Sequence, residues 1–241
     1  MSTVGDLDDI GRLLAFAAQP KLRPAAEDTY AALVERYHQD PDFAAAAESV
    51  LAGAGLDLLV DTREGFIVTA TSDSPLRATV TDIMKRANPV HRSLIGAVVL
   101  GVARTAFPDP AMLDDPDRVG VFTTRDVVET LDRVAETHRD ATGDDAVADE
   151  DEVETWRRWV DLNDTRVDAR RRSASDRPGI VRKVCGFLVE VGHLESRSTL
   201  EDGTWATRAR FRHAVAALTT DSDLYSDINE LLTVDGEHSG D

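Results

Sequence analysis

The residues best suited to chemistry are a run of basic side chains in the last third of the sequence. Between residues 166 and 183, seven cations stand against only Asp168 and Asp176, in a chain whose formal net charge is −18. Guanidinium groups form paired hydrogen bonds with phosphate oxygens, so the run predicts contact with a nucleic-acid backbone. Its members are Arg166, Arg170, Arg171, Arg172, Arg177, Arg182 and Lys183.

The overall charge leaves a second interpretation of these arginines open. A protein that holds duplex DNA by itself is usually basic, because phosphate contacts supply most of the affinity. This chain has a sequence pI near 4.6. The arginines could equally pair with the acidic segment at 143–154 or with the acidic surface of a partner. That segment could also act as a tether that masks the basic run. The acidity favours a subunit of a larger assembly.

The sequence carries no motif for catalysis. It has no phosphate-binding glycine loop, no nucleophile elbow, no HExxH and no carboxylate pair in a recognisable setting. The six histidines are scattered without ligand spacing, and Cys185 is the single cysteine. One cysteine excludes an internal disulfide and a zinc site built from cysteines. We expect a protein that is not an enzyme, with no cofactor and no metal site.

Apolar spacing predicts three helices and a hairpin in the first 71 residues. Glycines at 53 and 55 end the third helix, and the alternating strands that follow flank a turn at Thr62–Gly65. Three helices followed by a hairpin is the order of a winged helix. The predicted helices are 6–18, 24–37 and 41–52, and the apolar face of the first consists of Leu7, Ile10, Leu14 and Ala17.

Helices are also predicted in the middle of the chain, at 73–87, 91–106 and from Thr123 or Thr124 onward, with a proline-rich loop at 107–117. The segment 143–154 is crowded with like charges and therefore predicts a solvated linker. The predicted domains are an N-terminal winged helix with additional helices over 1–142, a linker at 143–155, a C-terminal winged helix over 156–233 and a disordered tail at 234–241.

The C-terminal domain is predicted from a second helix and hairpin pattern. Trp156 and Trp159 lie three residues apart and would anchor one helix to a core. A helix at 178–191 precedes strands at 193–198 and 204–212, the second of which continues through 214–218, and a last helix is expected at 223–232. The fold class is therefore α+β and mostly helical, with two tandem winged helices that carry short β-hairpin wings.

In a winged helix, the third helix and the wing are the parts that usually face DNA. The exposed face of the helix at 178–191 offers no Asn or Gln to bind adenine, so base-specific recognition is the weaker expectation. Arg197 would lie on the wing strands with two other arginines. The predicted DNA-binding residues are Arg170, Arg171, Arg172, Arg177, Arg182, Lys183, Arg208 and Arg210.

The tandem layout resembles that of the kite proteins, the winged-helix subunits of SMC complexes. It is most similar to the small subunits of the condensin-like MksBEF and Wadjet (JetABCD) systems. The resemblance rests on order and pattern over about Leu7–Leu232 and not on a signature motif. The segments that carry it are AEDTYAALVERYHQDPDFAAAAESVLAGAGLDLLVDTREGFIVT, HRSLIGAVVLGVARTAFP and FLVEVGHLESRSTLEDGTWATRARFRHAV.

This resemblance implies a non-catalytic subunit that binds a kleisin chain and forms a homodimer through its N-terminal half. The subunit would help an SMC-like ATPase to entrap or extrude DNA, in chromosome organisation or in defence against plasmids. The strongly acidic composition departs from the pattern of this family and argues against intimate DNA contact by this subunit. The same fold and arginine run also fit a winged-helix transcription regulator, so that alternative stays open.

The location expected from the sequence is the cytoplasm, in association with the nucleoid. The first residues carry acids where a signal peptide carries Lys or Arg. The longest apolar run, Leu94–Ala103, falls well short of the roughly 20 residues that span a bilayer, and we expect no membrane association.

Overall fold

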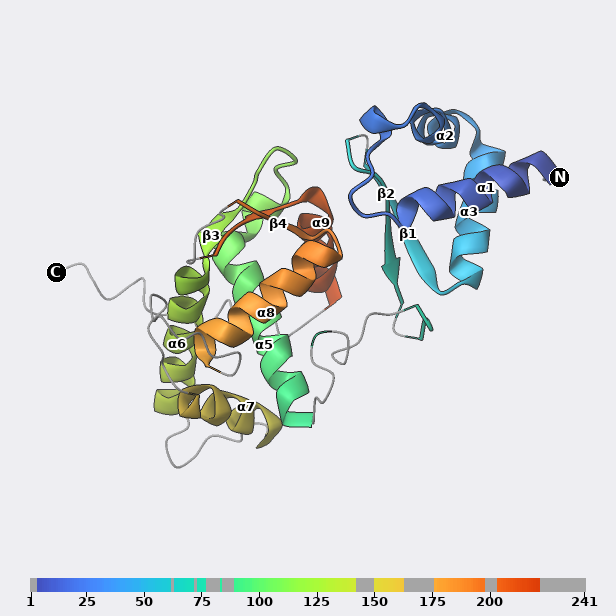
Figure 1. Ribbon diagram of the computed structural model, residues 1–241. Helices are drawn as coiled ribbons and strands as arrows, with labels where there is room; N and C mark the ends of the chain where they lie inside the picture. The colour runs from blue at the N-terminus through green and yellow to red at the C-terminus, as the bar shows by residue number, and fades with distance from the viewer. Residues whose placement is uncertain are drawn as a thin grey trace. The chain divides into compact units, whose positions relative to one another are not determined.

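The computed structural model describes residues 4–61, 63–71, 73–76, 83, 89–141, 150–162, 176–197 and 203–221. The chain forms two compact units, Met1–Thr79 and Val80–Asp241. Both contain helices and a small antiparallel sheet (Figure 1). The prediction of an α+β, mostly helical protein is confirmed.

The first unit consists of helices followed by a two-stranded hairpin. Asp40 begins α3 by accepting a hydrogen bond from the backbone N–H of Phe43 at 3.1 Å, and Pro41 fills the first helical position. The hairpin pairs Leu56 with Ala70 and Asp61 with Gly65. The elements are α1 (Val4–Ala17), a 3-10 turn (Pro24–Ala26), α2 (Asp28–Gln39), α3 (Pro41–Gly53), β1 (Leu56–Asp61) and β2 (Gly65–Ala70).

Tyr30 joins the helices of the first unit to the hairpin. Its ring is fully buried and stacks on Phe16 with ring centroids 4.9 Å apart. Its hydroxyl oxygen accepts a hydrogen bond from the backbone N–H of Phe66 at 2.6 Å. Gly65 has φ = +79°, and a Cβ there would clash with this hydroxyl, so the turn requires glycine both for its conformation and for space.

Arg36 connects the three helices of the first unit. Its guanidinium donates to Asp6 and, at 2.6 Å, to Asp9, both on α1. The same group lies 4.2 Å from the ring centroid of Phe43 on α3 and 3.7 Å from Asp40. One side chain of α2 therefore fixes the position of both neighbouring helices.

In the described part of the second unit, one strand lies between the helices Pro89–Ala106 and Thr124–Ala141, and a hairpin follows the helix Arg177–Glu190. The sheet has the order β3-β5-β4 with antiparallel pairing throughout, and Phe122 lies opposite Trp205. The elements are α5 (Pro89–Ala106), a 3-10 turn (Pro110–Leu113), β3 (Val121–Thr123), α6 (Thr124–Ala141), α7 (Glu150–Asp161), α8 (Arg177–Glu190), β4 (Leu194–Ser196), β5 (Thr204–Thr207) and α9 (Ala209–Asp221).

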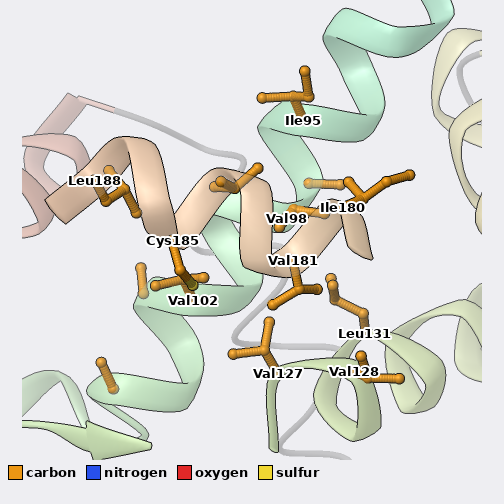
Figure 2. Close-up of a cluster of buried hydrophobic side chains, with 14 of the residues drawn as sticks. Ile95, Val98, Val102, Val127, Val128, Leu131, Ile180, Val181, Cys185 and Leu188 are labelled. Carbon is orange, nitrogen blue, oxygen red and sulfur yellow. The ribbon is translucent and has the colours of Figure 1, made fainter. Parts of the chain in front are cut away.

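Helix α8 is the centre of the second core. It packs against both α5 and α6, and seven of its 14 residues are buried. Figure 2 shows Val181 and Cys185 pointing from α8 toward Val127 of α6 and Val102 of α5. Each of these four side chains is fully buried. Complete burial of an aliphatic side chain contributes about 1.5–3 kcal/mol, so the buried face of α8 makes a large contribution to the stability of the unit.

Most of the predicted elements are confirmed. The helices expected at 6–18, 24–37, 41–52, 91–106, from 123 or 124, and at 178–191 all form, although 24–26 is a 3-10 turn. The hairpin at 56–71 also forms. Four predicted segments lie wholly or mostly outside the described residues: the helix at 73–87, the turn between the strands at 193–198 and 204–212, the last helix at 223–232 and the tail from 234.

One prediction about the second sheet was wrong, and one strand of this sheet was not predicted. The second strand does not run through residue 212 and on to 218, because β5 ends at Thr207 and α9 begins at Ala209. Phe211 and Val215, four residues apart, are 3% and 1% exposed, which is helical spacing. The three-residue strand β3 was not predicted at all, although it completes the sheet by pairing with β5.

The division into units also differs from the predicted domains, which placed a boundary at 143–155. Residues 142–149 lie outside the described part, and residues 150–155 belong to helix α7. Helices from the two sides of that segment pack together, because α5 and α6 both contact α7 and α8. The physical reason is the apolar face of α8, whose burial requires the surfaces of α5 and α6. Contacts instead divide the chain between residues 79 and 80.

Leu188→Ala should lower the free energy of unfolding by about 2–5 kcal/mol, because Leu188 is buried in the α8 core. Chemical denaturation followed by circular dichroism measures the change. Val160→Ala is the control, since Val160 is 44% exposed in the same unit. Equal effects of the two substitutions would contradict the central position of α8.

Candidate functional site

The described members of the predicted DNA-binding set differ in their exposure and in the contacts that they make within the protein. Arg170, Arg171 and Arg172 lie outside the described residues. Helix α8 carries Arg177, Arg182 and Lys183, whereas Arg208 directly precedes α9 and Arg210 lies within it. Lys183 is exposed, while Arg182 is half-buried. The remaining three, Arg177, Arg208 and Arg210, have contacts within the protein.

Arg177 fastens the start of α8 to two other helices. Its Nε donates to the carbonyl oxygen of Trp159 at 3.1 Å, and its Nη2 donates to that of Val160 at 2.9 Å. Its Nη1 donates to Asp132 of α6 at 3.1 Å. Asp132 also accepts a hydrogen bond from the Trp159 indole N–H at 2.8 Å. This guanidinium is therefore occupied inside the protein and is not presented to phosphate.

The arginines near β5 and α9 face inward or toward a carboxylate. Arg210 is 5% exposed and Arg212 is 4% exposed. The Nη1 of Arg212 donates a hydrogen bond to the carbonyl oxygen of Asp115 at 2.8 Å. Arg208 lies 3.7 Å from Glu195. The same carboxylate holds Arg197 at 2.5 Å. Glu195 thus offsets the charge of two arginines that the sequence placed on the DNA-facing side.

Helix α3 in the first unit occupies the position before a hairpin that α8 occupies in the second. It contains no Lys, Arg or His, and its exposed positions include Asp42 and Glu48. Carboxylates on such a face repel phosphate and supply none of the counterion release that drives DNA binding. The first unit therefore does not present this helix as a DNA-binding element.

Several large apolar side chains are exposed on the described surface. Single ones are ordinary on any protein, but neighbouring ones indicate a contact surface. Val4 and Leu7 of α1 are 86% and 55% exposed, and Val119 before β3 and Val121 within it are 47% and 63% exposed. Leu7 was predicted to lie on the buried face of the first helix, and this prediction was wrong. The buried residues of α1 are Ile10, Leu13 and Ala17.

Among the cavities on the described part of the second unit, two are the best formed, and neither is lined by a recognisable catalytic set. One, of about 390 Å³, is mainly apolar and lies between α6 and α7, where the imidazole of His138 stacks on Trp156 at 5.2 Å. The other, of about 380 Å³, is more polar and lies where the end of α5 meets β3 and α6. Within the described ranges, no three His, Cys, Asp or Glu side chains form a group that could hold a metal ion.

Burial shifts the pKa of two groups of the second core. It raises the pKa of the Cys185 thiol to about 12, which keeps the sulfur protonated and unreactive at neutral pH. Burial is the main cause that lowers the pKa of His193 to about 4, and the positive charge of Arg210 is the second cause. His193 is therefore neutral near pH 7 and serves as a packed side chain, in edge contact with the ring of Phe211 at 6.0 Å.

Comparison with known proteins assigns no family to this arrangement: no protein-family model matches the chain, and no curated protein matches it by sequence. In the described part of the chain, no helix is long and apolar enough to cross a membrane. The function must therefore be argued from the order of the elements and from the chemistry of the surfaces.

The stability of the protein should fall as the pH drops from about 6.5 to about 4, because His193 binds a proton in the unfolded chain before it does so in the folded one. The contribution of this residue is roughly 3 kcal/mol over that range. Unfolding measured as a function of pH, with His193→Gln compared with the wild type, isolates it from the carboxylates. An identical pH slope in the two proteins would contradict the buried, neutral state.

Proposed function

We propose that this chain is a non-catalytic, kite-type subunit of a condensin-like SMC complex, in which each of the two units is a winged helix. In this role it binds a kleisin-like subunit and assists an SMC-like ATPase in DNA entrapment or loop extrusion. The work of the complex would be chromosome organisation or defence against plasmids, in the cytoplasm and at the nucleoid.

The observation that carries this proposal is the order of elements in the second unit. A winged helix has three helices and a small sheet, with one strand after the first helix and a hairpin after the last. Helix α5, strand β3, helices α6 and α8 and strands β4 and β5 follow that order, with α7 as an additional helix. The sheet order β3-β5-β4 fits as well, because the hairpin's second strand lies in the middle.

The first unit supports the tandem arrangement with a shorter version of the same order. Three helices precede an antiparallel hairpin of two six-residue strands, β1 and β2. A repeated winged helix in one acidic chain is the layout to which the resemblance with kite proteins points. The repeat would begin after residue 79 and not after the acidic segment.

The charges of the described surface favour a protein partner over DNA as the main ligand. Helix α3 carries acids and no cations, and the guanidinium of Arg177 is occupied at the start of α8. Direct DNA contact would then depend on Arg170, Arg171 and Arg172 together with Lys183. A subunit that relies on its partners to hold DNA is consistent with a net charge of −18.

The proposal assigns ATP hydrolysis to the SMC-like partner. The sequence contains no phosphate-binding glycine loop. In the described residues the buried thiol of Cys185 and the neutral His193 serve the core. The homodimer that the kite layout implies is part of the same proposal.

Affinity capture of the tagged, full-length protein from its native host, followed by mass spectrometry, tests this function. We expect an SMC-like ATPase together with a kleisin-like protein. A matched capture with Leu188→Ala serves as the control, because disruption of the second core should reduce recovery of both partners. Capture of neither partner would contradict the proposal.

A transcription regulator is the alternative that the same experiment separates. It would be recovered with RNA polymerase and DNA, and the isolated protein would select one sequence from random duplexes with a strong dependence on salt. That result would replace the kite proposal.

A further inference from the structure

The cavity of about 390 Å³ on the second unit lies in the groove between α6 and α7. Helix α7 lies beside the C-terminal end of α6 in Figure 1, and the described residues that line the cavity belong to these two helices. The volume is within the range of roughly 300–1,000 Å³ that small-molecule sites occupy. Helix α7 is additional to the winged-helix order, so this cavity does not follow from the proposed function.

Apolar side chains form much of the lining. Ala135 of α6 and Trp156 of α7 are 3% and 7% exposed and belong to the second core. Val160 lies one helical turn after Trp156 and is 44% exposed, so part of the apolar lining remains in water. A ligand with an apolar body would cover this side chain, and the burial of carbon surface would favour binding.

Two aromatic rings of the lining have nearly parallel planes. The imidazole of His138 stacks on the indole of Trp156, with 5.2 Å between the ring centroids and 19° between the planes. Aromatic rings prefer offset stacking or edge contact with other aromatic rings, and such contacts add to the free energy of burial. This wall therefore favours a flat ring over an aliphatic group of the same size.

The two tryptophans of α7 differ in their hydrogen bonds. The indole N–H of Trp159 donates to Asp132 at 2.8 Å. The indole N–H of Trp156, in contrast, makes no hydrogen bond within the described part of the chain. Because a buried indole N–H usually has an acceptor, this donor is left for water or for an acceptor atom of a ligand.

The charged residues of the lining favour an anion. Arg139 of α6 and Arg157 of α7 are exposed, and one exposed carboxylate, Asp161, stands against them. Arg157 lies 3.5 Å from Glu154 in an ion pair whose side chains are 66% and 49% exposed. Such an exposed pair contributes little to stability, so the carboxylate of a ligand can take the place of Glu154 at this guanidinium.

The lining thus combines a flat apolar wall with two guanidinium groups. Guanidinium groups bind carboxylates through paired hydrogen bonds, whereas they repel a cationic ligand. A flat ring that carries a carboxylate matches both features at once. An inorganic anion would leave the apolar wall in water, and a neutral ring would leave the arginines without a new partner.

We propose that the cavity between α6 and α7 binds a small aromatic carboxylate, with its ring against His138 and Trp156 and its carboxylate at Arg139 and Arg157. The bound ligand joins α6 to α7. This site goes beyond the proposed function and does not depend on it.

Isothermal titration calorimetry of the full-length protein with 2-naphthoate tests the site. We expect saturable binding. The amide 2-naphthamide, which has the same rings and no charge, should bind about tenfold more weakly. Decahydronaphthalene-2-carboxylate, which keeps the charge and has no flat ring, should bind at least about threefold more weakly. No saturable binding of 2-naphthoate, or equal affinity for 2-naphthoate and either analogue, overturns the proposal.

A matched pair of substitutions on α7 tests the position of the ligand. Arg157→Glu should weaken the binding of 2-naphthoate by about tenfold or more, because an anion replaces a cation of the lining. Arg158→Glu is the control, since Arg158 is exposed on the same helix and is not among the lining residues. This variant should bind within about threefold of the wild type. Equal effects of the two substitutions overturn the proposal.

The indole N–H resonances of the three tryptophans provide a second measure of position. Addition of 2-naphthoate should shift the resonance of Trp156, which Trp156→Phe identifies by its loss. The resonance of Trp205, on β5, should not move. A shift of the Trp205 resonance without a shift of the Trp156 resonance overturns the proposal.

Affinity capture separates a small ligand from a protein partner at this cavity. If 2-naphthoate does not bind, and Arg157→Glu but not Arg158→Glu loses a captured protein, the cavity holds a protein side chain and the proposal is overturned. A chain that captures a kleisin-like protein and an ATPase but does not bind 2-naphthoate overturns the ligand site alone. A chain that binds 2-naphthoate through Arg157 and captures neither partner overturns the kite function and leaves the ligand site intact.

Discussion

The second unit depends on the burial of α8 between α5 and α6. Half of the helix is inaccessible to solvent, and the residues that cover it come from helices that precede it by roughly 40 to 90 positions in the sequence. Helix α7 is added to the same core through Trp159, which is 1% exposed. Once α8 is placed, the hairpin that follows it and the strand β3 that precedes α6 are brought together as one sheet.

This constraint explains why a basic helix start does not imply a DNA-binding surface. Arg177 begins α8, and its guanidinium satisfies two carbonyl oxygens at the end of α7 and the carboxylate of Asp132. A charge-assisted hydrogen bond of this kind is stronger than one between neutral groups, so it holds α7 and α8 in register. The arginines of α9 are likewise directed into the protein. The described surface still carries exposed cations such as Lys183, Arg157 and Arg158, but its exposed apolar side chains, such as Leu7 and Val121, suit protein partners.

The two units use different means to attach their hairpins. In the first, the hydroxyl of Tyr30 accepts the backbone N–H of Phe66, and Gly65 leaves the space for it. In the second, β5 is held on both sides, by β3 and by β4. The similarity between the units therefore lies in the order of elements, while the contacts that fix each hairpin are particular to each unit.

The sequence predicted the helices and the first hairpin because apolar periodicity and glycine or proline at the ends are local signals. It could not predict β3, because three residues are too few to show an alternation of apolar and polar side chains. It could not predict the division of the chain either, because α8 contacts helices that are distant in the sequence. Residues 204–218 were predicted as strand because Trp205 and Phe211 suit a strand as well as a helix, and tertiary packing decided between them. Leu7 was assigned to the buried face because several flanks of α1 are apolar.

The prediction of the candidate site was limited in the same way. Because Arg177 is an arginine, it was predicted to bind phosphate. Its role instead depends on hydrogen bonds to Trp159 and Asp132, which only the fold brings near it. The acidic segment resembled a linker in composition, although the helices on its two sides share one core.

The central claim is that residues 80–241 form one unit, with α5, α6 and β3 as necessary parts of it. Thermal unfolding of two fragments, 80–241 and 156–241, tests this claim most directly. The account predicts a single cooperative transition for the longer fragment and none for the shorter one, which lacks the helices that cover α8. A cooperative transition of the shorter fragment at the Tm of the longer one would contradict the account.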